Sequence, residues 1–377
     1  MRVAVLVAAA LVLAPRFAHA GDNAAPDPYE DIRESAPLDA HALVDLYYAG
    51  NVVHPVSHRN ELRAFDFRAD EPSIGYARLT LAHRPGRFGF RVDMGFGDLT
   101  DALFRSDPAS LQHPEMSQWF SHFTQAFVSG VIPIGTGLRV DVGKFATPVG
   151  YEANESIANW NYSRGLLYDW AEPSVHTGLA TTYSPGSHVS LASFVLNGWN
   201  VNIPDGVGHP SYAVAAVWKP SDAFDATMVY MTGPERDPVH FANRMLTWRH
   251  LLDAYVVWTP ERHVSFVLTG DYGHDAARGG VDWWGVAGFV RVDPTQWFDA
   301  AVRAEVLSDP EGYVTGRIQN VAEVTSTLDF HWTDEERRIS TRLEYRHDQS
   351  STFAFDVLSN DPRSRQDTIT AALLATF

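Results

Sequence analysis

The sequence predicts an all-β fold, a transmembrane antiparallel up-and-down β-barrel of about sixteen strands. Apolar and polar residues alternate in many short segments, as in strands with one apolar and one polar face. Short, turn-rich connections alternate with longer ones along the chain. Trp248 and Trp258 bracket one such segment, and about ten residues at ~3.3 Å rise and about 45° tilt span roughly 23 Å, close to the apolar band of an outer-membrane barrel.

Residues 1–20 have the form of a secretory signal peptide. Arg2 precedes an apolar core at 3–14, and 18–20 read Ala-His-Ala, the form that a signal peptidase accepts. A core of about 12 apolar residues is too short to span a bilayer as a helix. We therefore expect cleavage after Ala20. The predicted parts of the chain are a signal peptide at 1–20, a flexible periplasmic segment at 21–39 that is rich in Asp, Pro and Ala, and a barrel at 40–377.

The composition excludes several other classes of exported protein. No later stretch is continuously apolar over the roughly 20 residues that a membrane helix needs. Cysteine is absent, which excludes a lipid-bearing cysteine and a disulfide framework. Aromatic residues make up 12% of the chain, and scarcely one segment predicts an amphipathic helix, which favours a barrel over a soluble exported protein. The formal net charge of −17 argues against a nucleic-acid partner.

Sixteen candidate strands follow one another from residue 40 onward. They cover residues 40–50, 73–84, 86–97, 118–132, 137–145, 173–184, 188–199, 210–219, 222–232, 246–259, 262–273, 281–293, 295–307, 318–332, 337–347 and 367–377. Turn residues fill the short connections, near 84–86, 133–136, 184–187, 219–222, 259–262, 293–295 and 333–336. The longer connections lie at 51–72, 98–117, 146–172, 200–209, 233–245, 274–280, 308–317 and 348–366. Short turns are expected in the periplasm and long loops outside the cell.

The side chains of each strand divide into a lipid face and a lumen face. In the third strand Phe88, Phe90, Val92, Met94 and Phe96 are predicted to face lipid, and Arg87, Arg91 and Asp93 the lumen. In the last strand the lipid face holds Ile369, Ala371, Leu373, Ala375 and Phe377. A terminal Phe on such a strand resembles the signal by which outer-membrane barrels are recognised for assembly. The expected location is therefore the cell outer membrane, with its lipid and the barrel-assembly machinery as partners, and a homo-oligomer is an open alternative.

A set of short motifs resembles one known family, the OmpL-like β-barrel porins of Gram-negative outer membranes. The motifs are Gly143-Lys144-Phe145 through Pro148, Gly150-Tyr151-Glu152, Asn161-Tyr162-Ser163-Arg164, Pro173, His176-Thr177-Gly178 and Asn197-Gly198-Trp199. The resemblance is densest here, and elsewhere it is one of pattern. It implies an outer-membrane pore and names no substrate.

The lumen of a sixteen-stranded barrel is wide enough for an aqueous channel. The sequence therefore predicts a porin for passive diffusion of small hydrophilic solutes or ions. In general porins a long third external loop folds inward and narrows the channel, and here the third external connection, 146–172, is the longest. We expect this loop to form a constriction. The alternative is a loop that closes over the mouth or packs on a neighbouring subunit.

Charged residues suggest how such a constriction is built. The loop carries Glu152, Glu155, Asp169 and Glu172 against the single Arg164. The polar face of the preceding strand adds Arg139, and the far side of the ring offers Arg303, Arg338, Arg342 and Arg346. One hypothesis is a transverse field between the loop acids and the wall arginines. The other is local pairing of the arginines with Glu305, Glu323, Asp329 and Glu344.

Two further functional classes remain to be compared with a porin. A barrel with a plugged lumen would be a structural or adhesive protein, which conductance separates from a channel. A lipid-cleaving barrel would need a Ser-His pair, and His263 with Ser265 and His188 with Ser190 share a strand face. Both pairs fall at the periplasmic end and lack a placed third member, so no enzymatic activity is expected. His54 and His58 have no further ligands nearby, so neither a metal nor a cofactor is expected.

Overall fold

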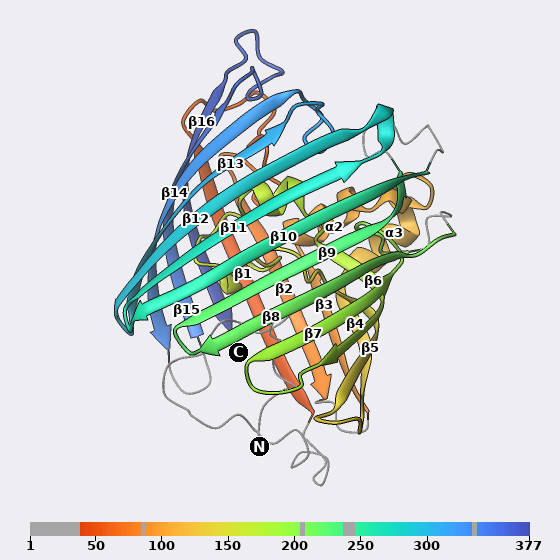
Figure 1. The fold of residues 1–377 in the computed structure, drawn as a ribbon. Helices are drawn as coiled ribbons and strands as arrows, with labels where there is room; N and C mark the ends of the chain where they lie inside the picture. The colour runs from red at the N-terminus through yellow and green to blue at the C-terminus, as the bar shows by residue number, and fades with distance from the viewer. Residues whose placement is uncertain (1–37, 84–87, 204–207, 237–245, 334–337) are drawn as a thin grey trace.

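The chain forms a closed antiparallel barrel of sixteen strands, which confirms the predicted fold and strand count (Figure 1). A computed structural model describes residues 38–83, 88–203, 208–236, 246–333 and 338–377. Each strand pairs with the next, and β16 pairs back with β1. Closure satisfies the backbone groups of all strand edges, which a lipid environment requires. Leu43 lies opposite Thr376, so the start of β1 and the end of β16 share one rim.

The strand boundaries fall close to the predicted ones. The strands are β1 (Asp39–Asn51), β2 (Pro72–His83), β3 (Gly89–Phe96), β4 (Phe123–Ile132), β5 (Leu138–Ala146), β6 (Val175–Tyr183), β7 (Val189–Leu196), β8 (Ser211–Ser221), β9 (Phe224–Arg236), β10 (Leu246–Glu261), β11 (Val264–Asp275), β12 (Val281–Thr295), β13 (Phe298–Asp309), β14 (Gln319–Thr333), β15 (Arg338–Ser350) and β16 (Arg365–Thr376). The short elements are α2 (Asp98–Ser106), η1 (Pro108–Leu111), α3 (Pro114–Ser121), η2 (Ser156–Ala158), η3 (Leu167–Ala171) and η4 (Ala277–Gly279). No helix in the described ranges is long and apolar enough to cross a membrane.

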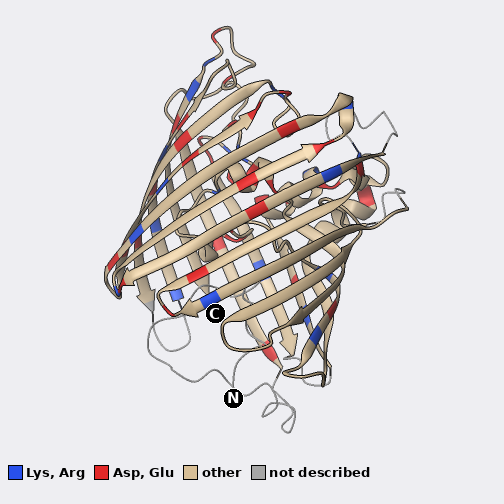
Figure 2. Cartoon of the chain, in the orientation of Figure 1, with Lys and Arg blue, Asp and Glu red and all other residues tan. Residues whose placement is uncertain are grey.

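The predicted division between lipid face and lumen face is confirmed. Phe88 and Phe96 are 82% and 58% exposed on the outside of the barrel, whereas Asp93 of the same strand is fully buried. On β16, Ile369, Leu373 and the final Phe377 are likewise exposed. Figure 2 shows charged residues as isolated positions along otherwise uncharged strands. Arg87 lies outside the described residues.

The turns and loops alternate as predicted where the structure describes them. Only two residues separate β8 from β9, β10 from β11, and β12 from β13. The connection after β5 is the longest between neighbouring strands. The predicted turn at 84–86, residues 334–336 of the next such turn, and parts of the loops at 200–209 and 233–245 lie outside the described residues.

One predicted strand boundary is wrong, because the connection after β3 is helical. The strand expected at 118–132 begins at Phe123, and the preceding residues form α3. Pro114 stands in the first turn of α3, where its missing N–H costs nothing. In α2, Leu99 and Leu103 are four residues apart and buried, the spacing of an amphipathic helix. The sequence predicted scarcely one amphipathic helix and did not reveal α2, because the helical spacing of its apolar residues extends over only nine residues.

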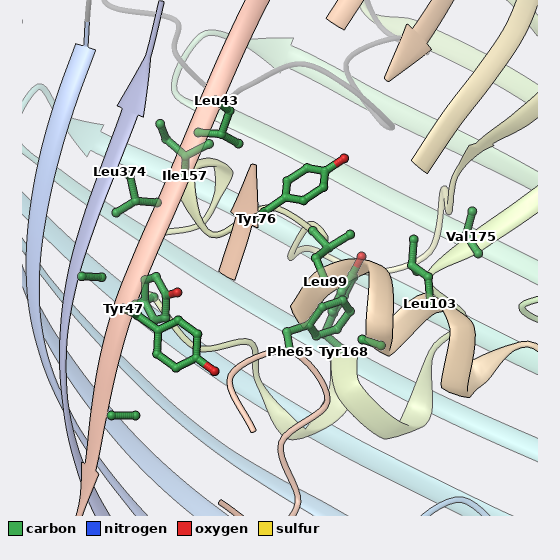
Figure 3. Close-up of a cluster of buried hydrophobic side chains, with 14 residues drawn as sticks. Leu43, Tyr47, Phe65, Tyr76, Leu99, Leu103, Ile157, Tyr168, Val175 and Leu374 are labelled. Carbon is green, nitrogen blue, oxygen red and sulfur yellow. The ribbon is translucent and has the colours of Figure 1, made fainter. Parts of the chain in front are cut away.

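The interior of the barrel is filled by loops as well as by strand side chains. A hydrophobic cluster joins Leu43 and Tyr47 of β1, Tyr76 of β2 and Leu374 of β16 (Figure 3). The same cluster contains residues of three external connections: Phe65 of 51–72, Leu99 and Leu103 of α2, and Ile157, Tyr162 and Tyr168 of 146–172. These connections therefore pack on one another inside the wall.

An epitope tag tests the orientation of the barrel. Asp361 lies in the long connection before β16, and Pro220 lies at the short turn after β8; both are exposed. A tag at Asp361 is expected to bind antibody on intact cells, whereas a tag at Pro220 is expected to bind only after the outer membrane is permeabilised. The reverse labelling would place the long loops in the periplasm.

Candidate functional site

Residues 146–172, which we call the inner loop, lie inside the barrel. Every residue from 161 to 168 is buried. The inner loop has little regular structure of its own, only η2 and η3, so its backbone groups need partners elsewhere. Several of those partners are side chains on the lumen face of β13 and β15.

Two carboxylates of the wall accept hydrogen bonds from inner-loop amides. Glu344 of β15 accepts from the backbone N–H of Tyr162 at 2.6 Å and of Ser163 at 3.0 Å. Glu305 of β13 accepts from the backbone N–H of Leu166 and, at 3.4 Å, of Leu167. Two wall carboxylates thus bind four amides in the buried centre of the inner loop.

Three arginines of the wall donate to inner-loop carbonyls. Arg303 donates to Ser163 O at 2.7 Å, Arg342 to Ser156 O at 2.7 Å, and Arg346 to Arg164 O at 2.6 Å. The planar guanidinium group suits this role because it can donate to several acceptors in fixed directions. Of the four wall arginines expected to face the loop, Arg303, Arg342 and Arg346 thus contact its backbone, and Arg338 is described below.

The same arginines are neutralised by carboxylates of the wall. Arg303 pairs with Glu323 at 2.8 Å, Arg342 with Asp329 at 2.7 Å, and Arg346 with Asp348 at 2.8 Å. This is the arrangement expected from local pairing. Because each of these arginines has an acidic neighbour, its charge is largely cancelled when seen from a distance. The transverse field between loop acids and wall arginines is weakened accordingly.

The loop acids have four different environments. Glu152 pairs with Arg303 at 2.8 Å and accepts from the Gly165 N–H at 2.6 Å. Glu155 pairs with Arg78 of β2. Asp169 accepts from the backbone N–H of Ala64 at 3.1 Å. Glu172 lies beside two further carboxylates, which are described below.

The remaining predicted site residues lie apart from this contact region or within the inner loop itself. Arg164 stacks over Phe65 at 4.4 Å and donates to Tyr162 O at 2.9 Å. Arg139 pairs with Asp141 of its own strand at 2.9 Å, near the short-turn rim. Arg338 begins β15 at the same rim, roughly 13 Å along the strand from Arg342.

Burial changes the acidity of the loop carboxyls. It raises the pKa of the Glu152 carboxyl, and the Arg303 guanidinium opposes that shift. Burial also raises the pKa of the Asp169 carboxyl to about 7, and the neighbouring Asp66 adds to the shift. Two loop carboxyls are therefore easier to protonate than carboxyls in water.

The first external connection, 51–72, was missed as part of the site. Arg63 pairs with Asp66 at 2.6 Å and with Asp348 of β15 at 3.1 Å, and all three side chains are buried. Phe65 packs on Tyr168 with ring centroids 5.9 Å apart. The alternation of aromatic, arginine and acidic residues over 63–68 was a usable signal, because solvent-exposed loops rarely need buried phenylalanines.

The predicted Ser-His pairs are not in contact with each other. His188 bonds to the Lys219 carbonyl at 3.0 Å, and Ser190 bonds to Ser184 at 2.9 Å. His263 similarly bonds to the Asp293 carbonyl at 2.8 Å. His54 bonds to Asp70 at 2.8 Å.

A family comparison agrees with this architecture. The model of the family described as "Putative beta-barrel porin-2, OmpL-like" matches residues 37–377. The chain belongs to this family. It is thus a β-barrel porin of the outer membrane, as the motif resemblance implied. No curated protein matches its sequence.

Solved structures with the same fold are outer-membrane barrels of low sequence identity. DcaP, an outer membrane channel of Acinetobacter baumannii, aligns with a TM-score of 0.59 at 8% identity, over 91% of this chain and 97% of that chain. OmpT of Vibrio cholerae in its trimer form gives 0.56 at 8% identity, over 91% and 100%. An anion-selective porin from Comamonas acidovorans gives 0.55 at 9% identity, over 91% and 100%. At these identities the likeness is one of fold.

The substitution Glu344→Gln tests how the inner loop is held. Glutamine has a single carbonyl oxygen, so a buried N–H of Tyr162 or Ser163 would lose its acceptor, at about 1–3 kcal/mol. The variant is expected to unfold at lower temperature or denaturant concentration, measured by the gel mobility of folded and unfolded barrel. Glu261→Gln, at an exposed strand end, is the matched control and should leave the transition unchanged. Equal transitions for parent and Glu344→Gln would contradict the role of Glu344.

Asp169 predicts a dependence of stability on pH. Its folded-state pKa of about 7 lies above the ordinary value of 3.8, so the folded barrel binds this proton more tightly than the unfolded chain. That contribution to stability is complete below pH 3.8 and is lost as the pH rises through 7. The unfolding temperature of Asp169→Asn, relative to the parent, is therefore expected to rise between pH 5 and pH 8. A constant difference over this range would show that Asp169 does not titrate there.

Proposed function

We propose that this porin lets small hydrophilic solutes or ions diffuse passively along an aqueous path narrowed by the inner loop. The observation that carries the proposal is the bonding of the loop backbone to the far wall through Glu344, Arg303 and Arg346. A loop held in this way occupies part of the lumen cross-section. The free width is then smaller than the barrel diameter, which favours small solutes.

The residues proposed to act at the constriction fall into two groups. The inner loop supplies Glu152, Glu155, Arg164, Asp169 and Glu172, and the wall supplies Arg303, Arg342 and Arg346. We place Arg139 and Arg338 on the same path closer to the periplasm. Because most of these charges are paired, and Arg303 and Arg346 are fully buried, the proposed role is to fix the loop that narrows the path, more than to create a strong net field.

A plugged barrel with a structural or adhesive role is the second candidate. The observation favouring it is that lumen-facing residues of β6 to β9 are also buried in an apolar cluster, including Ala180, Phe194, Ala213, Val229 and Met231. Packing of this kind reduces the lumen on the side away from the arginines. Single-channel conductance in a planar bilayer separates the candidates, because a plugged barrel carries no steady current.

Export and assembly belong to the same proposal. Cleavage after Ala20 would leave the segment 21–39 in the periplasm, and the last strand ending in Phe377 would be read by the assembly machinery. Outer-membrane lipid would contact the exposed apolar face. Since the OmpT structure is a trimer form, association of copies of this chain is a further expectation.

Removing the centre of the inner loop tests the constriction. Replacing residues 153–166 by a short Gly-Ser linker is expected to raise single-channel conductance severalfold, because electrical resistance is concentrated at the narrowest section. The matched control removes residues 357–361 from the connection before β16, where Leu358 is 72% exposed. That deletion should leave conductance unchanged.

The gel mobility of folded barrel must be checked for both deletions. A folded variant lacking 153–166 that conducts as the parent does would remove the inner loop from the permeation path. Absence of current in both the parent and the variant would favour the plugged barrel.

A further inference from the structure

Three carboxylates converge where the inner loop ends. Glu172 closes the inner loop, Asp253 lies on β10 and Asp271 on β11. One oxygen of each lies within 4.8 Å of those of the other two. Asp253 and Asp271 are direct cross-strand partners, so the barrel register fixes their separation (β10 and β11 in Figure 1). The positions of Asp253 and Asp271 are therefore fixed by the sheet, and the inner loop contributes Glu172.

These three carboxylates are buried, and in the described ranges no positive side chain compensates them. Glu172, Asp253 and Asp271 are 4%, 0% and 5% exposed. Within the described part of the chain, none of them forms an ion pair with arginine or lysine. Four shielded oxygens lack a hydrogen-bond partner there: Glu172 Oε2, Asp253 Oδ2, and Asp271 Oδ1 and Oδ2. Buried charges in proteins are normally paired or bound to a metal.

A second acidic cluster shows what compensation looks like in the same barrel. Asp299 and Asp329 lie close together with His331. Arg291 donates to Asp299 at 2.8 Å, and Arg342 donates to Asp329 at 2.7 Å. The carboxylates of this second cluster are neutralised by arginines, in contrast to those of the cluster at Glu172.

An uncharged oxygen also points to a ligand. Thr269, two residues before Asp271 on the lumen face of β11, is 4% exposed. Its Oγ1 lies beside Asp253 but makes no hydrogen bond of normal geometry to any described residue. A buried hydroxyl left unpaired is unfavourable unless something else in the site binds it.

Gly150 allows the inner loop to close over the cluster. Its backbone N–H donates to Asp253 Oδ1 at 3.1 Å. A Cβ at this position would lie 1.7 Å from Glu172 Oε2, and the backbone has φ +87°, a conformation that favours glycine. The place beside the carboxylates is thus kept clear of side-chain atoms.

We propose that Glu172, Asp253, Asp271 and Thr269 form a binding site for a hard divalent cation, with Ca²⁺ as the best fit. All four residues offer oxygen, which excludes a preference for the nitrogen and sulfur ligands of zinc or copper sites. Ca²⁺ accepts several carboxylates in variable geometry, whereas Mg²⁺ demands a near-ideal octahedron and keeps most of its waters. Three carboxylates from three chain segments suit the larger ion.

A cation at this place would fasten the end of the inner loop to β10 and β11. The arginines of β13 and β15 already hold the middle of the loop from the neighbouring part of the wall. Binding to the folded state alone would stabilise the barrel by mass action. The cation site does not depend on the proposed role of the loop in permeation, since it concerns binding and stability.

The test uses the full-length mature protein refolded in detergent and freed of metal with EDTA. Titration with CaCl₂ is expected to show one tight Ca²⁺ per chain by calorimetry and to raise the temperature at which the folded band disappears on a gel. Terbium is a second probe, because bound Tb³⁺ should be sensitised by nearby tryptophans such as Trp170 and Trp283. Added Ca²⁺ should displace it.

Single substitutions distinguish Ca²⁺ binding at these residues from a general effect of removing a negative charge. Asp271→Asn is expected to weaken Ca²⁺ binding at least tenfold, and Thr269→Val to weaken it less. Asp299→Asn removes a carboxylate that has an arginine partner and should bind Ca²⁺ as the parent does. In EDTA, Asp271→Asn should be at least as stable as the parent, since one uncompensated charge is gone, and this distinguishes site loss from misfolding.

Two results would overturn the proposal. One is a parent protein with neither one-to-one Ca²⁺ binding nor a Ca²⁺-dependent unfolding temperature, in which case the carboxyls share protons instead. The other is equal Ca²⁺ affinity in the parent, Asp271→Asn and Asp299→Asn, which would place the ion elsewhere. Conductance plays no part in either outcome, so failure of the pore proposal would remain distinguishable.

Discussion

The inner loop depends on wall side chains to satisfy its backbone. A closed barrel satisfies the backbone of every strand, but a loop that crosses its interior has no such ladder. Here Glu305 and Glu344 accept from loop amides, and Arg303, Arg342 and Arg346 donate to loop carbonyls. Charged side chains on β13 to β15 thus take the place of secondary structure.

Burial of so many charges is tolerated because each arginine has more than one partner. Removing one member of a buried pair leaves the other uncompensated, which costs about 3–5 kcal/mol in proteins generally. Such pairs add little stability compared with apolar packing, and their benefit is a defined geometry. The geometry they define here is the path of the inner loop across the lumen.

The strands could be predicted because their information is local. Alternation along β3 and β16, and the turn residues between strands, do not depend on distant contacts. The second half of α3, from residue 118, was assigned to a strand because Trp119 and Phe120 precede Phe123 of β4 in one continuous apolar run. The existence of the sixteen strands could be predicted, whereas the helices of the connection after β3 could not.

The candidate site could be predicted from the sequence only in part, because the pairing register of the strands decides which side chains meet there. Charge alone singled out Arg303, Arg342 and Arg346, and ring geometry placed them opposite the inner loop. Nothing local indicates that Glu344 binds two amides, since that depends on where Tyr162 and Ser163 lie. The meeting of Glu172 with Asp253 and Asp271 likewise needs both the β10–β11 register and the course of the loop.

The ion pairs also form a continuous chain between two loops. Arg63 of the first external connection contacts Asp348 at 3.1 Å, and Arg346 links Asp348 at 2.8 Å with Glu323 at 3.4 Å. Arg303 then joins Glu323 to Glu152 of the inner loop, each at 2.8 Å. Three arginines alternate with three acids across β15, β14 and β13. Substitutions within such a chain are coupled rather than additive. In this barrel the buried charges that hold the first external connection and the inner loop therefore belong to one network, so the positions of the two loops are coupled.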